Sequence, residues 1–174
     1  MTKQLARLYD ALVVLVVVII VGMDQWTKAL VVEHLSPPDI GPQIHLIGEY
    51  LVLLYTRNNG VAFSLFANSI VLIVLISVAV VVVSSLYVRL LNTGSLAIKL
   101  IFGLMMGGAL SNLISRAQHA GYVVDFIAFR IPQIGFYFAI FNIADAAICV
   151  GVFLLFVMVL FGRFRHSPKA TGTR

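Results

Sequence analysis

The sequence predicts a membrane protein that is all-α apart from a small β element, with four transmembrane helices and a sheet on the outward side. Hydrophobic residues make up 61% of the 174 residues, and charged residues only 11%. Residues 58–88 carry no charged side chain, and Asp145 is the only charge in residues 131–162. Residues 50–56, in contrast, are rich in side chains that favour β-strands.

Four apolar stretches are long enough to cross a bilayer as helices, which takes about 20 residues. They lie at residues 11–32, 66–88, 97–115 and 141–162. The first resembles a secretory signal peptide as far as Asp24, because Lys3 and Arg7 precede its apolar run. No small-x-small cleavage site follows, and apolar residues resume at residues 29–32, which favours a transmembrane helix. We therefore expect a single integral membrane domain over residues 1–174.

The basic residues predict that both termini are cytoplasmic, because cytoplasmic loops are enriched in Lys and Arg. The cytoplasmic side would carry Lys3, Arg7, Arg89, Lys99, Arg163, Arg165, Lys169 and Arg174, and the outer side Arg57, Arg116 and Arg130. The longer connections, residues 33–65 and 116–140, would then face outward. This bias accounts for the net charge of +5 without a nucleic-acid partner, since the charges do not form one patch.

The outward segment 33–65 is predicted to contain a strand. It begins with the loop signal Ser-Pro-Pro-Asp at residues 36–39, and residues 50–56 follow as the strand. Both faces of this strand are apolar, which indicates a small sheet lying against the membrane. Residues 58–60, Asn-Asn-Gly, favour a tight turn. Residues 61–63 would then either return as a second strand or begin a longer second transmembrane helix.

The third span carries Gly103, Gly107 and Ser111 at intervals of four residues, a stripe that lets another helix approach closely. Asn112 and Arg116, also four residues apart, reach the outer end of this helix. They are either a helix-end anchor or a ligand-binding pair. The following loop, residues 121–141, is crowded with aromatic side chains, which places it at the membrane–water interface.

Asp125 and Asp145 are the candidate catalytic residues, because a carboxylate near hydrocarbon is costly and is by default functional. Pro132 and Gly135 interrupt the path between them and let the chain turn back to bring them together. Two carboxyls in one site do not both ionise cheaply, so the pair would offer an acid and a base, as in aspartic proteases. Asn142 would cap the fourth helix, which places Asp145 near its positive end and makes Asp145 the more easily ionised member.

Asp24 and Lys28 lie four residues apart on one helical face, which offsets part of the cost of burying them. They either support local structure only or help to hold the polar wall of a site. Cys149 is the single cysteine and is expected to pack within the fourth apolar run. The four histidines have no ligand spacing, so neither a metal nor another cofactor is expected.

A second class of function also fits membrane aspartates, namely a small transporter or proton-relay protein. It predicts acids near the bilayer midplane and repeated half-structures. The acids here lie toward the outer end of their spans, and no internal repeat is apparent.

Five short blocks of sequence carry a resemblance to a known family. They are Asp24-Gln25-x-x-Lys28, Asn58-Asn59-Gly60-Val61-Ala62-Phe63, Gly107-Gly108-Ala109-Leu110-Ser111-Asn112-Leu113-Ile114-Ser115-Arg116, Val123-Val124-Asp125-Phe126 and Phe141-Asn142-Ile143-Ala144-Asp145. In this order, over residues 24–145, the chain resembles bacterial lipoprotein signal peptidase, also called prolipoprotein or type II signal peptidase.

The resemblance implies an intramembrane aspartic endopeptidase with four transmembrane helices and an outward-facing β-cradle. It would sit in the bacterial cytoplasmic membrane, with its active site toward the outer face. Its substrates would be diacylglyceryl-modified prolipoproteins, cut just before the lipidated lipobox cysteine to release the signal peptide. The resemblance assigns Asp125 and Asp145 to catalysis and Asp24, Asn58, Asn112, Arg116 and Asn142 to the lining of the site. It also implies contact with membrane lipid and inhibition by globomycin, a cyclic lipopeptide, and we expect a monomer.

The chain departs from the family pattern at two positions. The family usually reads Gly-Asn-Leu-Ile-Asp-Arg where this chain has Ser-Asn-Leu-Ile-Ser-Arg at residues 111–116. Ser111 still fits the stripe of small residues, so helix packing should survive. The acid missing at Ser115 is expected to deprive Arg116 of a partner and to affect efficiency rather than identity.

Overall fold

The computed structural model describes residues 2–60 and 96–162. Its helices are α1 (Lys3–Leu35), α3 (Leu96–Gln118) and α4 (Ile143–Gly162). Its strands are β1 (Ile44–Ile47), β2 (Leu51–Asn58), β3 (Val123–Ile131) and β4 (Phe136–Tyr137), and the 3-10 turn η3 (Pro132–Ile134) joins β3 to β4. The predicted span 66–88, the alternatives for residues 61–63 and the basic C-terminal tail lie outside the described residues.

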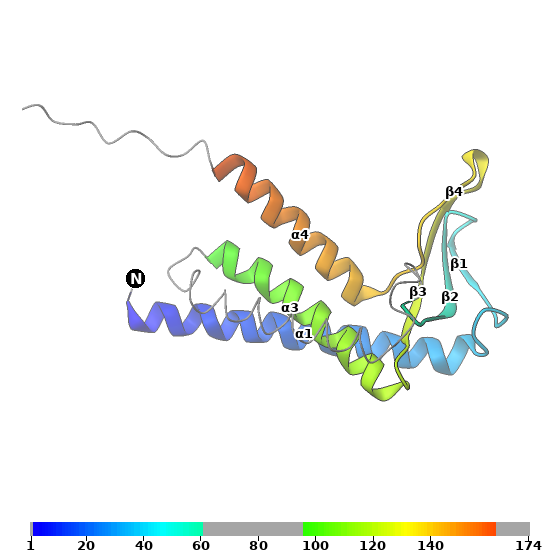
Figure 1. Cartoon of the computed structure of the whole chain (residues 1–174), viewed down its shortest axis with the longest axis horizontal. Helices are drawn as coiled ribbons and strands as arrows, with labels where there is room; N and C mark the ends of the chain where they lie inside the picture. Colours follow the sequence, from blue (N-terminus) through cyan, green and yellow to red (C-terminus); the bar gives the residue numbers. More distant parts are fainter. Residues whose placement is uncertain (1, 61–95, 163–174) are drawn as a thin grey trace, which may run out of the picture.

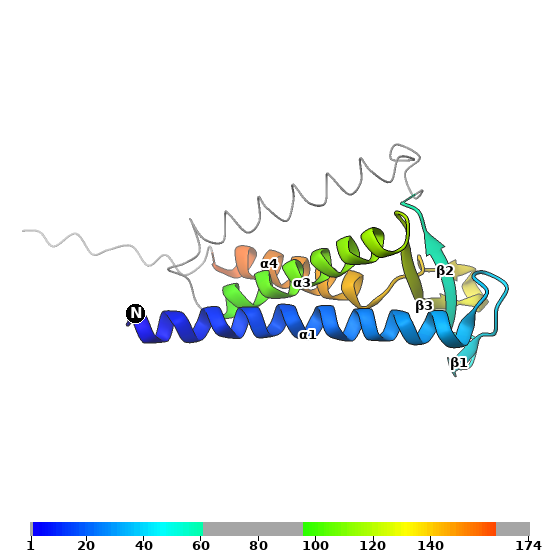
Figure 2. The same ribbon diagram turned by 90° about the horizontal axis from the view of Figure 1, so that it is seen from below.

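The three described helices run side by side, and the sheet crosses one end of them (Figures 1 and 2). Helix α3 packs against both α1 and α4. The start of α1 and the end of α4 lie at the end of the helices that is remote from the sheet (Figure 1). The sheet therefore lies at one end of the helices, and the start of α1 and the end of α4 lie at the other.

The sequence explains where these helices begin, end and touch. Helix α1 begins after Thr2, whose hydroxyl accepts a hydrogen bond from the Leu5 N–H, and it ends before the Ser36–Pro37 step. It is longer than the predicted span 11–32 at both ends. The stripe of small residues on α3 packs against α1: a Cβ added at Gly107 would lie 3.0 Å from the Cβ of Ile20. This confirms the predicted close helix approach.

Apolar side chains cover much of the helix exterior, as a lipid environment requires. Among the described residues, α1 and α3 are long and apolar enough to cross a membrane, while the apolar stretch of α4 within Ile143–Met158 is shorter. The exposed apolar side chains on α1 and α4 include Val18, Trp26, Phe153 and Phe156. Cys149 is also exposed, so the expectation that it packs in the interior is wrong.

The strands form one antiparallel sheet in the order β1–β2–β3–β4. Strand β2 confirms the strand predicted at residues 50–56. The segment 121–141, expected to be an aromatic loop, instead contains β3 and β4 as a hairpin. This expectation missed the strand because β3 pairs with β2, which is remote in sequence, with Thr56 opposite Asp125. The hairpin turns at Gly135, whose φ of 66° suits glycine, so the predicted reversal is confirmed.

The sheet is fixed to the helices by a small hydrophobic core. Val31 and Leu35 of α1 pack with Tyr55, Val124 and Phe126 of the sheet. Because side chains alternate along a strand, Asp125 projects to the opposite face from Val124 and Phe126. That face turns toward the start of α4, which is where the candidate site lies.

Candidate active site

Asp125 is held by two asparagine amides on the buried face of β3. It is only 1% exposed. Its Oδ2 accepts a hydrogen bond from Asn58 Nδ2 at 2.8 Å, and its Oδ1 accepts one from Asn142 Nδ2 at 2.6 Å. Asn58 is fixed in turn because its Oδ1 accepts the Gly60 N–H at 2.8 Å. The turn predicted at residues 58–60 thus also orients a site residue.

Asp145 lies in the first turn of α4, directly after the Asn142 cap. The Asp145 N–H donates to Asn142 Oδ1 at 2.9 Å, and the Asn142 N–H donates to Asp145 Oδ2 at 3.3 Å. This reciprocal capping box confirms the predicted cap. The other oxygen, Oδ1, accepts a hydrogen bond from Asn112 Nδ2 at 2.7 Å. Asp145 is half-buried, so water can reach it more readily than it reaches Asp125.

Asn142 joins the two aspartates, because it bonds to both carboxyl groups and is itself fully buried. Two acids that are 20 residues apart in the chain therefore meet at the sheet end of the helices. Their electrostatic interaction is repulsive when both are charged. The arrangement matches the sequence expectation for the pair of acids.

Burial raises the pKa of Asp125 from its ordinary 3.8 to about 6. The hydrogen bond from Asn58 works against this shift, whereas the negative charge of Asp145 adds to it. The bond from Asn142 and the positive charge of Lys28 lower the pKa in smaller measure. Asp125 therefore keeps its proton at pH values where an exposed aspartate has lost it.

Asp24 and Lys28 link α1 to both α3 and α4. They form a buried ion pair, with 2.6 Å between Lys28 Nζ and Asp24 Oδ2. Asp24 Oδ1 also accepts the Ala144 N–H at 2.9 Å, which ties α1 to the first turn of α4. Lys28 Nζ donates to Asn112 Oδ1 at 3.1 Å. The pair therefore supports the framework and reaches the residue that bonds to Asp145.

The side chain of Ser115 lies toward α1 rather than toward Arg116. Its Oγ accepts hydrogen bonds from Lys28 Nζ and Gln25 Nε2, both at 3.0 Å. Gln25 also donates to Ser111 Oγ at 2.8 Å, and Ser111 Oγ donates to Asp24 Oδ2 at 2.7 Å. Both departures from the family pattern thus lie in one polar network between α1 and α3.

Arg116 is an anchor at the end of α3 that also faces the acids. Its Nη1 donates to the Gly121 carbonyl oxygen at 2.7 Å, which holds the turn into β3. Its charge interacts with both Asp125 and Asp145. Its buried Nε has no hydrogen-bond partner among the described residues. The guanidinium is thus only partly satisfied beside the two carboxyl groups.

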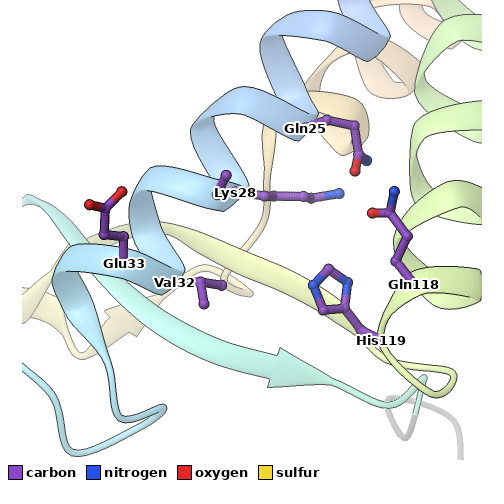
Figure 3. A pocket seen from close by; sticks show the side chains of 7 residues that line it. Gln25, Lys28, Val32, Glu33, Gln118 and His119 are labelled. Carbon is purple, nitrogen blue, oxygen red and sulfur yellow. The ribbon is translucent and has the colours of Figure 1, made fainter.

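A cavity of about 340 Å³ opens beside this network, between α1 and the end of α3 (Figure 3). Lys28 and Gln25 extend into the space from α1, opposite Gln118 and His119. Sequence reasoning did not single out Gln25 as a site residue, although a glutamine within an apolar span was the available signal. Within residues 2–60 and 96–162, no three His, Cys, Asp or Glu side chains gather closely enough to hold a metal ion.

Comparison with known proteins agrees with this geometry. The model of the family described as signal peptidase (SPase) II matches residues 16–161. The chain belongs to the signal peptidase II family. A lipoprotein signal peptidase of Bacillus velezensis is 37% identical over 147 residues, covering 84% of this chain and 92% of that protein. One of Bacillus subtilis is 36% identical over 146 residues, covering 84% of this chain and 91% of that protein.

Solved structures show the same fold. One bacterial membrane enzyme, studied by the in meso method, has a TM-score of 0.78 and 26% identity over 93% of this chain and 95% of its own. A second has a TM-score of 0.74 and 28% identity over 86% of this chain and 93% of its own. As a member of the signal peptidase II family, the chain is an aspartic-type peptidase of the membrane.

Proposed function

We propose that this chain is an intramembrane aspartic endopeptidase that removes the signal peptide from diacylglyceryl-modified prolipoproteins, cutting just before the lipidated cysteine. One observation carries the proposal. Asp125 and Asp145 arrive from β3 and α4 and share Asn142 at the sheet end of the helices. The substrate class follows from the relatives, which are lipoprotein signal peptidases.

In the proposed reaction Asp145 acts as the base and Asp125 as the acid. Asp145 takes a proton from a water molecule as its oxygen attacks the scissile carbonyl carbon. Asp125 gives its proton to the carbonyl oxygen, which forms a neutral tetrahedral intermediate. When the C–N bond breaks, Asp145 returns its proton to the leaving nitrogen and Asp125 regains one from a hydroxyl of the intermediate. Protons balance over one turnover without a metal or cofactor.

The raised pKa of Asp125, about 6, supports its role as the acid. The position of Asp145 at the positive end of the α4 dipole supports its role as the carboxylate. Carbon-13 NMR of the aspartate side chains during a pH titration tests the order of ionisation. Asp145 losing its proton only after Asp125 would reverse the two roles.

The remaining site residues would position the acids and the substrate. Asn58, Asn112 and Asn142 donate to the carboxyl oxygens and keep them oriented. Asp24 would hold the start of α4 through the Ala144 N–H. Arg116, with its buried Nε unbonded, would offer a donor to a carbonyl of the bound peptide.

The whole chain would form one membrane domain with four transmembrane helices, including residues 66–88, and would act as a monomer. Both termini would be cytoplasmic, and the sheet would form an outward-facing β-cradle at the outer surface of the bacterial cytoplasmic membrane. A diacylglyceryl anchor and an apolar signal helix both confine the scissile bond to the interface depth. The pair of acids at the sheet end would meet it there. Globomycin is expected to inhibit cleavage.

The position of the acids at the helix ends, beside the sheet, disfavours the transporter alternative, which requires acids near the midplane. Asp125→Asn and Asp145→Asn should each abolish cleavage of a purified lipidated precursor. Asp39 is exposed, and the control variant Asp39→Asn should cleave the precursor at the wild-type rate. The readout is loss of the signal peptide on a gel, with an unlipidated precursor as the substrate control. Full processing by either of the first two variants would refute the proposal.

A further inference from the structure

Three asparagine amides donate to the carboxyl oxygens, and in each the amide oxygen is held by a group that can only donate. An amide has a donor end and an acceptor end, so such a group fixes which way it points. For Asn58 the group is the Gly60 N–H, and for Asn142 it is the Asp145 N–H. Both are backbone groups, so these two orientations follow from the fold itself.

Asn112 differs because a side chain fixes its orientation. Its Oδ1 accepts from Lys28 Nζ at 3.1 Å, with a longer contact of 3.3 Å from Asn142 Nδ2. An ammonium group has three donors and no acceptor, so only the amide oxygen can face it. The NH2 end of Asn112 is thereby directed at Asp145 Oδ1, 2.7 Å away.

Lys28 is itself held in a single position. Its three N–H groups have three acceptors: Asp24 Oδ2 at 2.6 Å, Ser115 Oγ at 3.0 Å and Asn112 Oδ1 at 3.1 Å. The side chain is 2% exposed and extends from α1 toward α3 (Figure 3). Nothing about this arrangement leaves the ammonium free to bond a substrate.

We propose that Lys28 is a positioning residue for the peptidase reaction, which locks the Asn112 amide so that it donates to Asp145. This inference rests on the proposed function of Asp125 and Asp145. Without Lys28 the amide could turn over and place its oxygen against the Asp145 carboxylate, where two acceptors repel. The base would then lose a hydrogen bond that aligns it with the attacking water.

The positive charge of Lys28 also acts on the acids directly. Among the described residues, the charged groups around the site are Asp24 and Lys28 from α1, Arg116 from α3, Asp125 from β3 and Asp145 from α4. Two further titratable side chains, Glu33 from α1 and His119 after α3, line the cavity beside Lys28. Lys28 lowers the pKa of Asp125, so its removal would raise that pKa further. The alkaline limb of the pH profile, where Asp125 loses the proton that it must donate, should move to higher pH when Lys28 is neutralised.

The test compares Lys28→Met with the wild-type protein. The value of kcat should fall on the order of 10-fold to 100-fold, because a misplaced catalytic group costs that much. KM should stay within about twofold, since Lys28 does not bond the substrate. The double variant Asp24→Asn/Lys28→Met removes both buried charges together and should show the same loss of kcat with a smaller pH shift, because the two charges act on Asp125 with opposite sign. This variant controls for misfolding of Lys28→Met, because it leaves no buried Asp24 charge without its partner.

Lys99 supplies a matched control. It is fully buried and pairs with Asp10 at 2.6 Å, so it also joins α1 and α3, but near the ends remote from the sheet. Lys99→Met should lower thermal stability without moving the pH profile. A pH shift in Lys99→Met equal to that of Lys28→Met would mean that any buried lysine has this effect and would overturn the proposal.

A double-mutant cycle with Asn112→Ala decides whether Lys28 acts through Asn112. Once the amide is gone, adding Lys28→Met should lower kcat little further. The proposal would be refuted if Lys28→Met lowered kcat by the same factor in the wild-type protein and in Asn112→Ala. It would also be refuted if Lys28→Met kept the wild-type kcat and pH profile. The proposed function itself would survive such results as long as Asp125→Asn remains inactive.

Discussion

Asp125 binds its proton more tightly in the folded protein than in the unfolded chain. Its folded pKa is about 6, against an ordinary value of 3.8. Between these values the folded state holds more protons than the unfolded state, so the stability contributed by this group falls as pH rises from about 4 to about 6. A shift of about two units corresponds to about 3 kcal/mol.

The pH dependence of thermal unfolding in detergent checks this linkage. Asp125→Asn should remove the part of the slope that Asp125 causes, so the variant should gain stability relative to wild type as pH rises from about 4 to about 6. The asparagine side chain has one hydrogen-bond acceptor fewer than the carboxylate, which lowers the free energy of unfolding, but this loss does not vary with pH. If the unfolding temperatures of the two proteins changed with pH in the same way across this range, the raised pKa of Asp125 would be contradicted.

Helix α3 uses adjacent glycines to approach two different helices. Gly103 and Gly107 face α1, whereas Gly108 faces α4. A Cβ at Gly108 would lie 2.4 Å from the Ala144 carbonyl oxygen and 2.8 Å from Ile148 Cγ1. The first of these is a backbone atom, so α4 itself would have to move. Ala144 directly precedes Asp145, which means that packing of α3 on α4 sets the position of an acid that we propose to be catalytic.

Gly108→Ala should therefore impair cleavage, although residue 108 is not one of the proposed site residues. Moving the start of α4 by several tenths of an ångström displaces Asp145 from Asn112, and activity should fall at least about 10-fold. Gly22→Ala is the matched control, because a Cβ there meets no atom of the described residues within 4 Å. It should keep full activity and gain up to about 1 kcal/mol of stability from helix propensity. Wild-type activity for Gly108→Ala would show that α4 tolerates the displacement.

The start of α4 is held from three sides, which explains why so many polar residues gather there. Asn142 caps it locally, Asp24 accepts the Ala144 N–H from α1, and Asn112 donates to Asp145 from α3. Each bond uses a group that the helix end leaves unpaired or a carboxylate that its dipole stabilises. The same contacts therefore support the fold and orient Asp145, the proposed base.

Features that depend on local sequence could be predicted, and long-range pairings could not. Apolar length marked the helices, and the Asn142 cap and the reversal at Gly135 were visible in short motifs. Strand β3 was missed because its partner residues, such as Thr56 for Asp125, are remote in the chain. The bond from Asp24 to Ala144 spans 120 positions and has no local signal. The family pattern linked the acid missing at residue 115 to Arg116, whereas the side chain of Ser115 lies on the α1 side of α3.

The described helices have the sheet at one end and the start of α1 at the other (Figure 1). Asp125 in β3 and Asp145 in the first turn of α4 lie at the sheet end. The sheet end also carries exposed aromatic side chains at Phe136, Tyr137 and Phe138, which suit the headgroup region. If this end faces outward, as proposed, a thiol placed there should react with a reagent that does not cross the membrane.

Cysteine labelling tests this orientation in a Cys149→Ala background. Glu49 is exposed near the sheet end, and its partners Arg130 and His45 are exposed or partly so, so Glu49→Cys should cost little. It should react with a membrane-impermeant maleimide in intact spheroplasts. Thr2→Cys, before α1, should react only after the membrane is permeabilised, because a cytoplasmic amino terminus is shielded. The reverse pattern would place the acids in the cytoplasm, away from any lipoprotein precursor cleaved at the outer surface.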